Sequence, residues 1–168
     1  MANVLRVALT GASGTVGQFV LARLAAEGVK VRAASHSAQS PATKQAKGVE
    51  WVRYSMKDSA SAANLLADCD ALVHCALHHE PGRYRGGEAA DPAGFWATNL
   101  GGTLNLLAAA EQAGTKRAVL LSSRAVFADG SAARRGVCND SSPTQPNTHY
   151  GALKQAEEAV ARSWSANK

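Results

Sequence analysis

The octapeptide Thr10-Gly11-Ala12-Ser13-Gly14-Thr15-Val16-Gly17 decides the fold, and it lies between an apolar run and an amphipathic segment. Gly11 permits a tight turn, Gly14 lets backbone approach a pyrophosphate, and Gly17 allows a helix to pack closely on a strand. The amides at the start of the following helix would face the phosphates with the positive end of the helix dipole. A flexible connector would also be rich in glycine, but the position between a strand and a helix favours a dinucleotide-binding turn. The residues expected to contact the dinucleotide here are Thr10, Gly11, Ser13, Gly14, Thr15, Val16 and Gly17.

Short apolar runs alternate with helical patterns along the rest of the chain. The predicted strands are 4–9, 29–34, 49–53, 71–75 and 117–121. The predicted helices are 15–27, 60–67, 93–113 and 148–163. This alternation predicts an α/β, Rossmann-type fold, a doubly wound parallel sheet of about five strands in the order 3-2-1-4-5 with helices on both faces. The length favours one domain, a nucleotide-binding unit over residues 1–168.

The composition excludes several other classes of protein. The chain has 168 residues and a formal charge of +5, but its basic residues are scattered as singles or pairs such as Arg134-Arg135. Nucleic-acid readers concentrate such charge on one face. Three cysteines without a CxxC pair predict neither a disulfide framework nor a metal site. Since no signal-peptide pattern and no membrane-length apolar run is present, we expect a cytoplasmic protein with no nucleic-acid or membrane partner.

The end of the second predicted strand bears on which cofactor is bound. A carboxylate about 20 residues beyond the glycine turn would hold the ribose hydroxyls of NAD. Ser35 and His36 occupy this position, and no acidic residue is nearby. A neutral-to-basic edge tolerates the 2′-phosphate of NADP better, although the segment could also be an ordinary polar loop. The sequence favours NADP over NAD.

Five motifs, in order along the chain, resemble the short-chain dehydrogenase/reductase superfamily, in particular its extended, epimerase/dehydratase branch. The glycine turn is similar to the family's TGxxGxxG, and His74-Cys75-Ala76 is similar to its V-H-x-A strand end. The segment FWATNLGGT, which contains Asn99, resembles N-x-x-G-T, and SSRAVF resembles SSxxVY with Phe127 in place of tyrosine. Tyr150 and Lys154 form the spacing YxxxK, which places both on one helix face.

The resemblance implies roles for the residues at these positions. Tyr150 would be the general acid/base, and the Lys154 ammonium would stabilise its phenolate. Ser123 would hydrogen-bond the reacting oxygen, while Asn99 would hold a water for a proton relay. The Ala76 backbone would border the cofactor, and His74 would pack under the nucleotide. Purely structural alternatives stay open: a surface Tyr-Lys pair, a capping serine at position 122 or 123, and an asparagine that bends its helix.

These roles predict hydride and proton transfer at a secondary alcohol or carbonyl, with a sugar nucleotide as one candidate substrate. Arg83 and Arg85 could hold its anionic group or could simply be solvated. Extended members carry a further substrate-binding region after the Tyr-Lys helix, which is expected to be absent from this chain. Three interpretations follow: an inactive fragment of a longer enzyme, a non-catalytic NAD(P)-binding sensor or partner module, or a short enzyme whose pocket is completed by oligomerisation. A homodimer is the oligomer considered.

Overall fold

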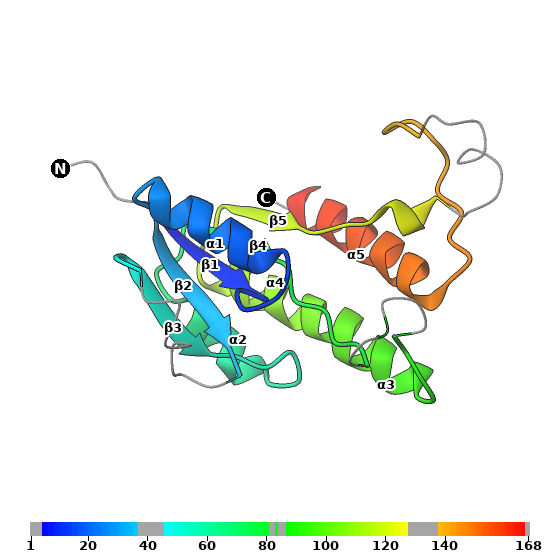
Figure 1. Cartoon of the computed structure of the whole chain (residues 1–168), viewed down its shortest axis with the longest axis horizontal. Helices are drawn as coiled ribbons and strands as arrows, with labels where there is room; N and C mark the ends of the chain where they lie inside the picture. Colours follow the sequence, from blue (N-terminus) through cyan, green and yellow to red (C-terminus); the bar gives the residue numbers. More distant parts are fainter. Residues whose placement is uncertain (1–4, 37–45, 81–82, 84–86, 128–137, 167–168) are drawn as a thin grey trace. The chain divides into compact units, whose positions relative to one another are not determined.

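A computed structural model describes residues 5–36, 46–80, 83, 87–127 and 138–166 (Figure 1). Internal contacts divide the chain into two units. The first comprises Met1–Leu77 and Gly102–Leu121, and the second comprises His78–Gly101 and Ser122–Lys168.

The first unit is built on a five-stranded sheet in which every neighbouring pair of strands is parallel. Its order is β3-β2-β1-β4-β5, which confirms the predicted Rossmann-type order. The strands are β1 (Arg6–Thr10), β2 (Lys30–Ser35), β3 (Val49–Arg53), β4 (Ala71–His74) and β5 (Arg117–Leu120). Because β1 lies at the centre and the winding direction reverses between β1 and β4, the carboxyl end of β1 lies at the topological switch point.

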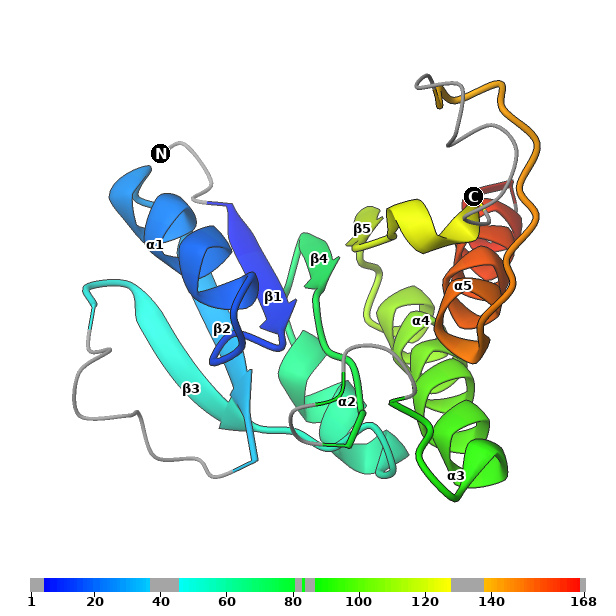
Figure 2. The ribbon, with the colours of Figure 1, turned by 45° about the vertical axis from the view of Figure 1, so that its right-hand side comes forward.

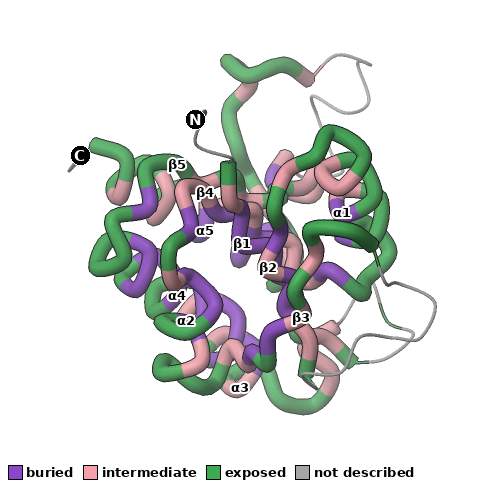
Figure 3. The backbone as a smooth tube through the Cα atoms, turned by 90° about the vertical axis from the view of Figure 1, so that its left-hand side faces the viewer, coloured by how far each residue is buried: buried purple, intermediate pink, exposed green. Residues whose placement is uncertain are grey.

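Helices cover both faces of this sheet. Figure 3 shows α1 (Gly17–Ala26) on one side of the strands, with α2 (Ser59–Leu66) and α4 (Gly102–Gln112) on the other. On the face of the sheet that α1 covers, Leu21 of the helix packs in a buried cluster with Leu9 and Val31 of the central strands. The helix begins at Gly17 rather than at the expected Thr15, because Val16 is its N-cap residue and the residues before it form the turn.

β5 forms one end of the sheet in the described part of the chain. Its Val119 side chain is 61% exposed, and Leu121, which follows the strand, is 39% exposed. This end of the sheet therefore presents apolar side chains on one face.

The second unit is helical. It contains α3 (Pro92–Trp96), the π-helical turn η1 (Ala97–Gly101), the 3₁₀ turn η2 (Arg124–Val126) and α5 (His149–Ala166), and Figure 2 shows these segments from a second direction. Among its residues, Phe95, Val126 and Leu153 are buried. The segment 93–113 is helical as predicted as far as Gln112, but residues 97–101 adopt π-helical rather than α-helical geometry.

Candidate functional site

The glycine turn has no room for side chains at two of its glycines. Gly11 has φ +65°, and a Cβ on it would lie 2.7 Å from backbone atoms of Cys75 and Ala76. A Cβ on Gly17 would lie 2.0 Å from the Gly11 carbonyl oxygen. Gly14 closes the turn by donating its N–H to that same oxygen at 2.9 Å. The turn is thus tightly packed against the end of β4 and the start of α1, as the sequence motif predicts.

The start of α1 is open to a ligand. Val16 is the N-cap residue and supplies no side-chain hydrogen bond to the helix, although such a bond is the usual way to satisfy its first amides. Ser13, Gly14, Thr15 and Val16 are all exposed. A glycine turn of this geometry, followed by an uncapped helix start, suits a phosphate group.

Buried hydroxyls tie the turn to the end of β4. Thr10 is fully buried, and its Oγ1 accepts N–H bonds from Cys75 and Ala76, each at 3.2 Å. His74 is 1% exposed, with Nδ1 at 2.6 Å from that oxygen and Nε2 at 3.1 Å from the Thr103 hydroxyl of α4. The expected cofactor-bordering residue Ala76 is therefore joined directly to Thr10.

The carboxyl ends of β2 and β3 place a cation beside the expected ribose position. Ser35 lies opposite Arg53 in the β2–β3 register, and Arg53 is exposed. His36, also exposed, follows Ser35. The sequence has no acidic residue between Gly28 and Val49. Sequence reasoning missed Arg53, which strand pairing alone brings next to Ser35.

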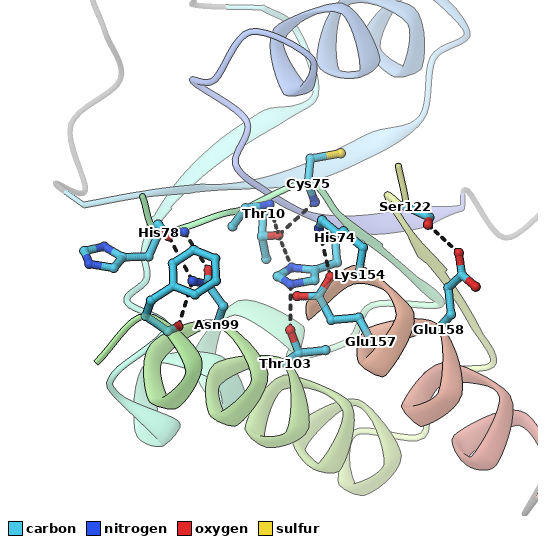
Figure 4. A network of polar contacts seen from close by, with 12 residues as sticks. Thr10, His74, Cys75, His78, Asn99, Thr103, Ser122, Lys154, Glu157 and Glu158 are labelled. Carbon is cyan, nitrogen blue, oxygen red and sulfur yellow. Dashed lines mark hydrogen bonds and ion pairs between the residues drawn. The ribbon is translucent and has the colours of Figure 1, made fainter. Parts of the chain in front are cut away.

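Tyr150 and Lys154 lie on one face of α5 in the second unit. The Lys154 Nζ is 6.0 Å from the centre of the Tyr150 ring. Lys154 is 4% exposed and forms an ion pair of 2.8 Å with Glu157, which is 2% exposed (Figure 4). Since burying an unpaired ammonium is costly, this carboxylate stabilises the charge that the predicted chemistry requires. Glu157 was missed because a glutamate three residues after a lysine also occurs on solvated helix faces.

The two serines after β5 have different partners. Ser122 donates its hydroxyl hydrogen to Glu158 of α5. Ser123 is the N-cap residue of η2, and its Oγ accepts the Ala125 N–H at 3.2 Å. Among the described residues, Ser123 and Tyr150 share no hydrogen bond. The Ser123 hydroxyl hydrogen is not used by the cap, so this side chain can cap η2 and still donate to a ligand.

Asn99 is fully buried in the π-helical turn. Its Oδ1 accepts the His78 N–H at 2.7 Å, and its Nδ2 donates to the carbonyl oxygens of His78 and Phe95 at 2.9 Å each. Asn99 thereby fixes the segment that follows β4. The bond to Phe95, four residues earlier, joins the π-helical turn to α3, so the structural alternative for Asn99 stays open beside the role that the resemblance implies.

The arginines considered for substrate binding are only partly described. Arg83 donates its backbone N–H to the Glu80 carbonyl oxygen at 3.1 Å, whereas Arg85 and the pair Arg134-Arg135 lie outside the described residues. Over the described ranges, no cluster of three His, Cys, Asp or Glu residues is arranged to hold a metal. The helices of those same ranges include none that is both long and apolar enough to cross a membrane.

The order of elements and the glycine turn define an α/β nucleotide-binding protein, and comparison with known proteins gives its family. Residues 7–168 match the model of the NAD dependent epimerase/dehydratase family, so the chain belongs to this family. Its relatives are NAD-dependent oxidoreductases and epimerases, and the resemblance inferred from the five motifs is confirmed.

Three similar proteins indicate the range of the family. A Stigmatella aurantiaca 4-hydroxy-2-methyl-3-oxo-4-farnesyl-3,4-dihydroquinoline-1-oxide ketoreductase is 32% identical over 95% of this chain and 46% of its own length. UDP-glucose 4-epimerase of Streptomyces lividans is 26% identical over 88% of this chain and 44% of its own. The structure of MoeE5 in complex with UDP-glucuronic acid and NAD is 26% identical, with a TM-score of 0.78 over 96% of this chain and 50% of that one. The chain thus spans about half the length of the relatives it matches.

Proposed function

We propose that this chain carries the cofactor site and the acid/base group of an NAD(P)-dependent oxidoreductase or epimerase acting at a secondary alcohol or carbonyl. Tyr150 is the general acid/base, Lys154 supplies its neighbouring charge, Ser123 holds the reacting oxygen and Asn99 supports the proton relay. One observation carries the proposal. In this chain, which belongs to the epimerase/dehydratase family, the ammonium of Lys154 is buried on the same helix face as Tyr150, four residues earlier. Burial of a charge costs free energy, and such placements concentrate at functional sites.

The residues that would hold the cofactor belong to the first unit. Gly11, Gly14 and the start of α1 fit a pyrophosphate, because residues 13–16 are exposed and the N-cap residue Val16 makes no side-chain hydrogen bond to the first amides of the helix. Arg53 and His36 fit a 2′-phosphate, which supports NADP over NAD. With NADP held by these residues, the site would have the hydride chemistry of the nicotinamide available to it.

Each proton step is assigned to residues of the second unit. In the oxidative direction the Tyr150 phenolate takes the proton of the substrate hydroxyl, and in the reductive direction the phenol returns it to the carbonyl oxygen. The Lys154 ammonium stabilises the phenolate, and Glu157 fixes the position of that ammonium. Ser123 donates its hydroxyl hydrogen to the substrate oxygen, so charge on that oxygen is stabilised as it develops.

The substrate class follows from the relatives and belongs to this proposal. UDP-glucose 4-epimerase and MoeE5 are named for, or bound to, sugar nucleotides, whereas the ketoreductase is named for a quinoline-oxide ketone. A carbonyl or alcohol is common to them. Two further expectations stay predictions: that residues 1–168 form one domain, and that the protein forms a homodimer.

The direct test replaces Tyr150 with phenylalanine and measures turnover of carbonyl and sugar-nucleotide substrates with NADPH. We expect kcat to fall by about 10²- to 10⁴-fold, the usual contribution of a general acid/base, with little change in NADPH affinity. Tyr54→Phe is the matched control, because the Tyr54 hydroxyl is buried and makes no hydrogen bond in the described residues. Turnover of Tyr150→Phe at the parent rate contradicts the role of Tyr150, and NADPH binding by a parent without turnover favours the sensor or partner module.

Cofactor preference is tested separately with Ser35→Asp. A carboxylate at this position would repel a 2′-phosphate and accept bonds from ribose hydroxyls. We expect the ratio of NADPH to NADH affinity, measured by fluorescence titration, to fall by at least tenfold. An unchanged ratio contradicts the placement of the 2′-phosphate at this strand end.

A further inference from the structure

Three buried polar side chains from three different elements of the first unit form one chain of hydrogen bonds. They are Thr10 at the end of β1, His74 at the end of β4 and Thr103 in α4, each at most 1% exposed. Figure 4 shows the imidazole between the two hydroxyls. The Thr10 hydroxyl lies 2.6 Å from Nδ1, and the Thr103 hydroxyl lies 3.1 Å from Nε2.

The number of donors and acceptors around Thr10 fixes the direction of its bond to His74. The Thr10 Oγ1 accepts from the Cys75 and Ala76 N–H groups, and the Cys75 group is shared with the Thr10 carbonyl oxygen at 3.3 Å. A hydroxyl has two acceptor positions and one hydrogen, so this hydrogen is directed to Nδ1 of His74. With a proton on Nδ1 instead, the buried Thr10 hydroxyl would have no acceptor among the described residues, which is unfavourable.

We infer that His74 is held as the neutral tautomer with its proton on Nε2 and acts as a positioning residue for the nucleotide-binding turn. Nδ1 accepts from Thr10, and the Nε2–H donates to Thr103. This assignment satisfies every bond of the chain. It also fixes the rotation of the Thr10 hydroxyl, which is therefore free to accept from the end of β4.

The consequence for the turn follows from how closely it approaches β4. Thr10 directly precedes Gly11, and the Gly11 backbone passes so near Cys75 and Ala76 that not even a methyl group fits between them. Beside the backbone ladder that pairs Thr10 with His74, the two N–H bonds to the Thr10 hydroxyl join the ends of β1 and β4. Because His74 determines which way that hydroxyl points, it acts on the phosphate-binding backbone through Thr10. This inference rests on the proposed binding of NAD(P) at the turn.

Two substitutions of His74 separate positioning from a general structural role. In His74→Asn the side-chain oxygen occupies roughly the place of Nδ1 and can accept from Thr10, but it does not reach Thr103. In His74→Gln the amide reaches the place of Nε2 and can donate to Thr103, but it leaves Thr10 without an acceptor. Each variant keeps one of the bonds to Thr10 and Thr103 and loses the other. If His74 had only a general structural role, both variants would lose NADPH affinity to a similar extent.

The readouts are fluorescence titration with NADPH and NADH, urea unfolding, and ¹⁵N NMR of the parent's histidine ring nitrogens. We expect an Nε2–H signature for His74, affinity of His74→Asn within about threefold of the parent, and affinity of His74→Gln at least about tenfold weaker, the effect of one buried hydrogen bond. An Nδ1–H signature, or equal losses of affinity in the two variants, would overturn the inference. Absence of binding by the parent would overturn the proposed function itself, while the NMR result still decides the tautomer.

If the His74 variants do not fold, two variants of Thr10 test the same hydrogen bond. Thr10→Ser keeps the hydroxyl, whereas Thr10→Val keeps the shape and removes it. We expect Thr10→Ser to bind NADPH nearly as the parent does and Thr10→Val to bind at least about tenfold more weakly. Equal affinities in these two variants would contradict the role of the hydroxyl.

Discussion

Replacement of Gly17 by alanine is the sharpest test of the packing of the glycine turn. Alanine in a helix is ordinarily favoured over glycine by about 0.5–1 kcal/mol. At Gly17, however, the added Cβ would lie 2.0 Å from the Gly11 carbonyl oxygen, which must move by about 1 Å to restore the 3.0 Å that real contacts keep. Overpacking of this kind costs about 1–3 kcal/mol, so we expect a net loss of about 1–2 kcal/mol of unfolding free energy.

Urea unfolding and thermal melting measure this loss, and NADPH titration measures its effect on the turn. For a chain of this size the melting temperature should fall by about 3–6 °C, and NADPH affinity should fall because the displaced Gly11 carbonyl belongs to the turn proposed to bind the phosphates. Gly101→Ala is the matched control, because Gly101 is also helical and a Cβ there has nothing within 4 Å. It should be neutral or stabilising. A Gly17→Ala protein as stable as Gly101→Ala, with unchanged affinity, refutes the packing argument.

Three further outcomes are expected. Asp58→Ala removes the side chain that accepts the Ala60 N–H at the start of α2, and urea unfolding should show a loss of about 1 kcal/mol. Glu157→Gln removes the charge that pairs with buried Lys154 and should cost about 3 kcal/mol, whereas Glu158→Gln, on a more exposed pair, should cost less than about 1 kcal/mol; similar losses would contradict the burial argument. Burial raises the pKa of the Cys69 thiol to about 11, so its labelling by iodoacetamide at pH 8 should be far slower than that of a free cysteine and should rise only as the pH approaches this value.

The sheet was predictable from sequence because each strand is a short apolar run between polar segments. Its order followed from strand–helix alternation, which permits few right-handed windings. Boundaries were less predictable: α1 begins two residues later than expected because Thr15 and Val16 belong to the turn. The π-helical turn at 97–101 does not change the spacing of the apolar residues, so the sequence pattern predicted only a continuous helix.

The candidate site residues were identified from their motifs, but the residues that contact them were not. The ion pair of Lys154 with Glu157 depends on burial of both groups, and burial of charged residues is not visible in a single sequence. Likewise, Arg53 becomes a neighbour of Ser35 only through the β2–β3 register. The spacing of residues along the sequence does not predict such pairs, so only the three-dimensional structure identifies them.

The position of β5 at the end of the sheet has a practical consequence for handling the protein. An edge strand can offer backbone groups for pairing, and β5, the last strand among the described residues, also exposes Val119, so it is a candidate site at which other chains can add. Concentrated solutions should therefore aggregate through this strand, and a lysine at position 119 would oppose aggregation by placing charge at the point of addition. Because Val119 belongs to neither the glycine turn nor the Tyr-Lys helix, such a change offers a way to keep the protein in solution for the titrations above.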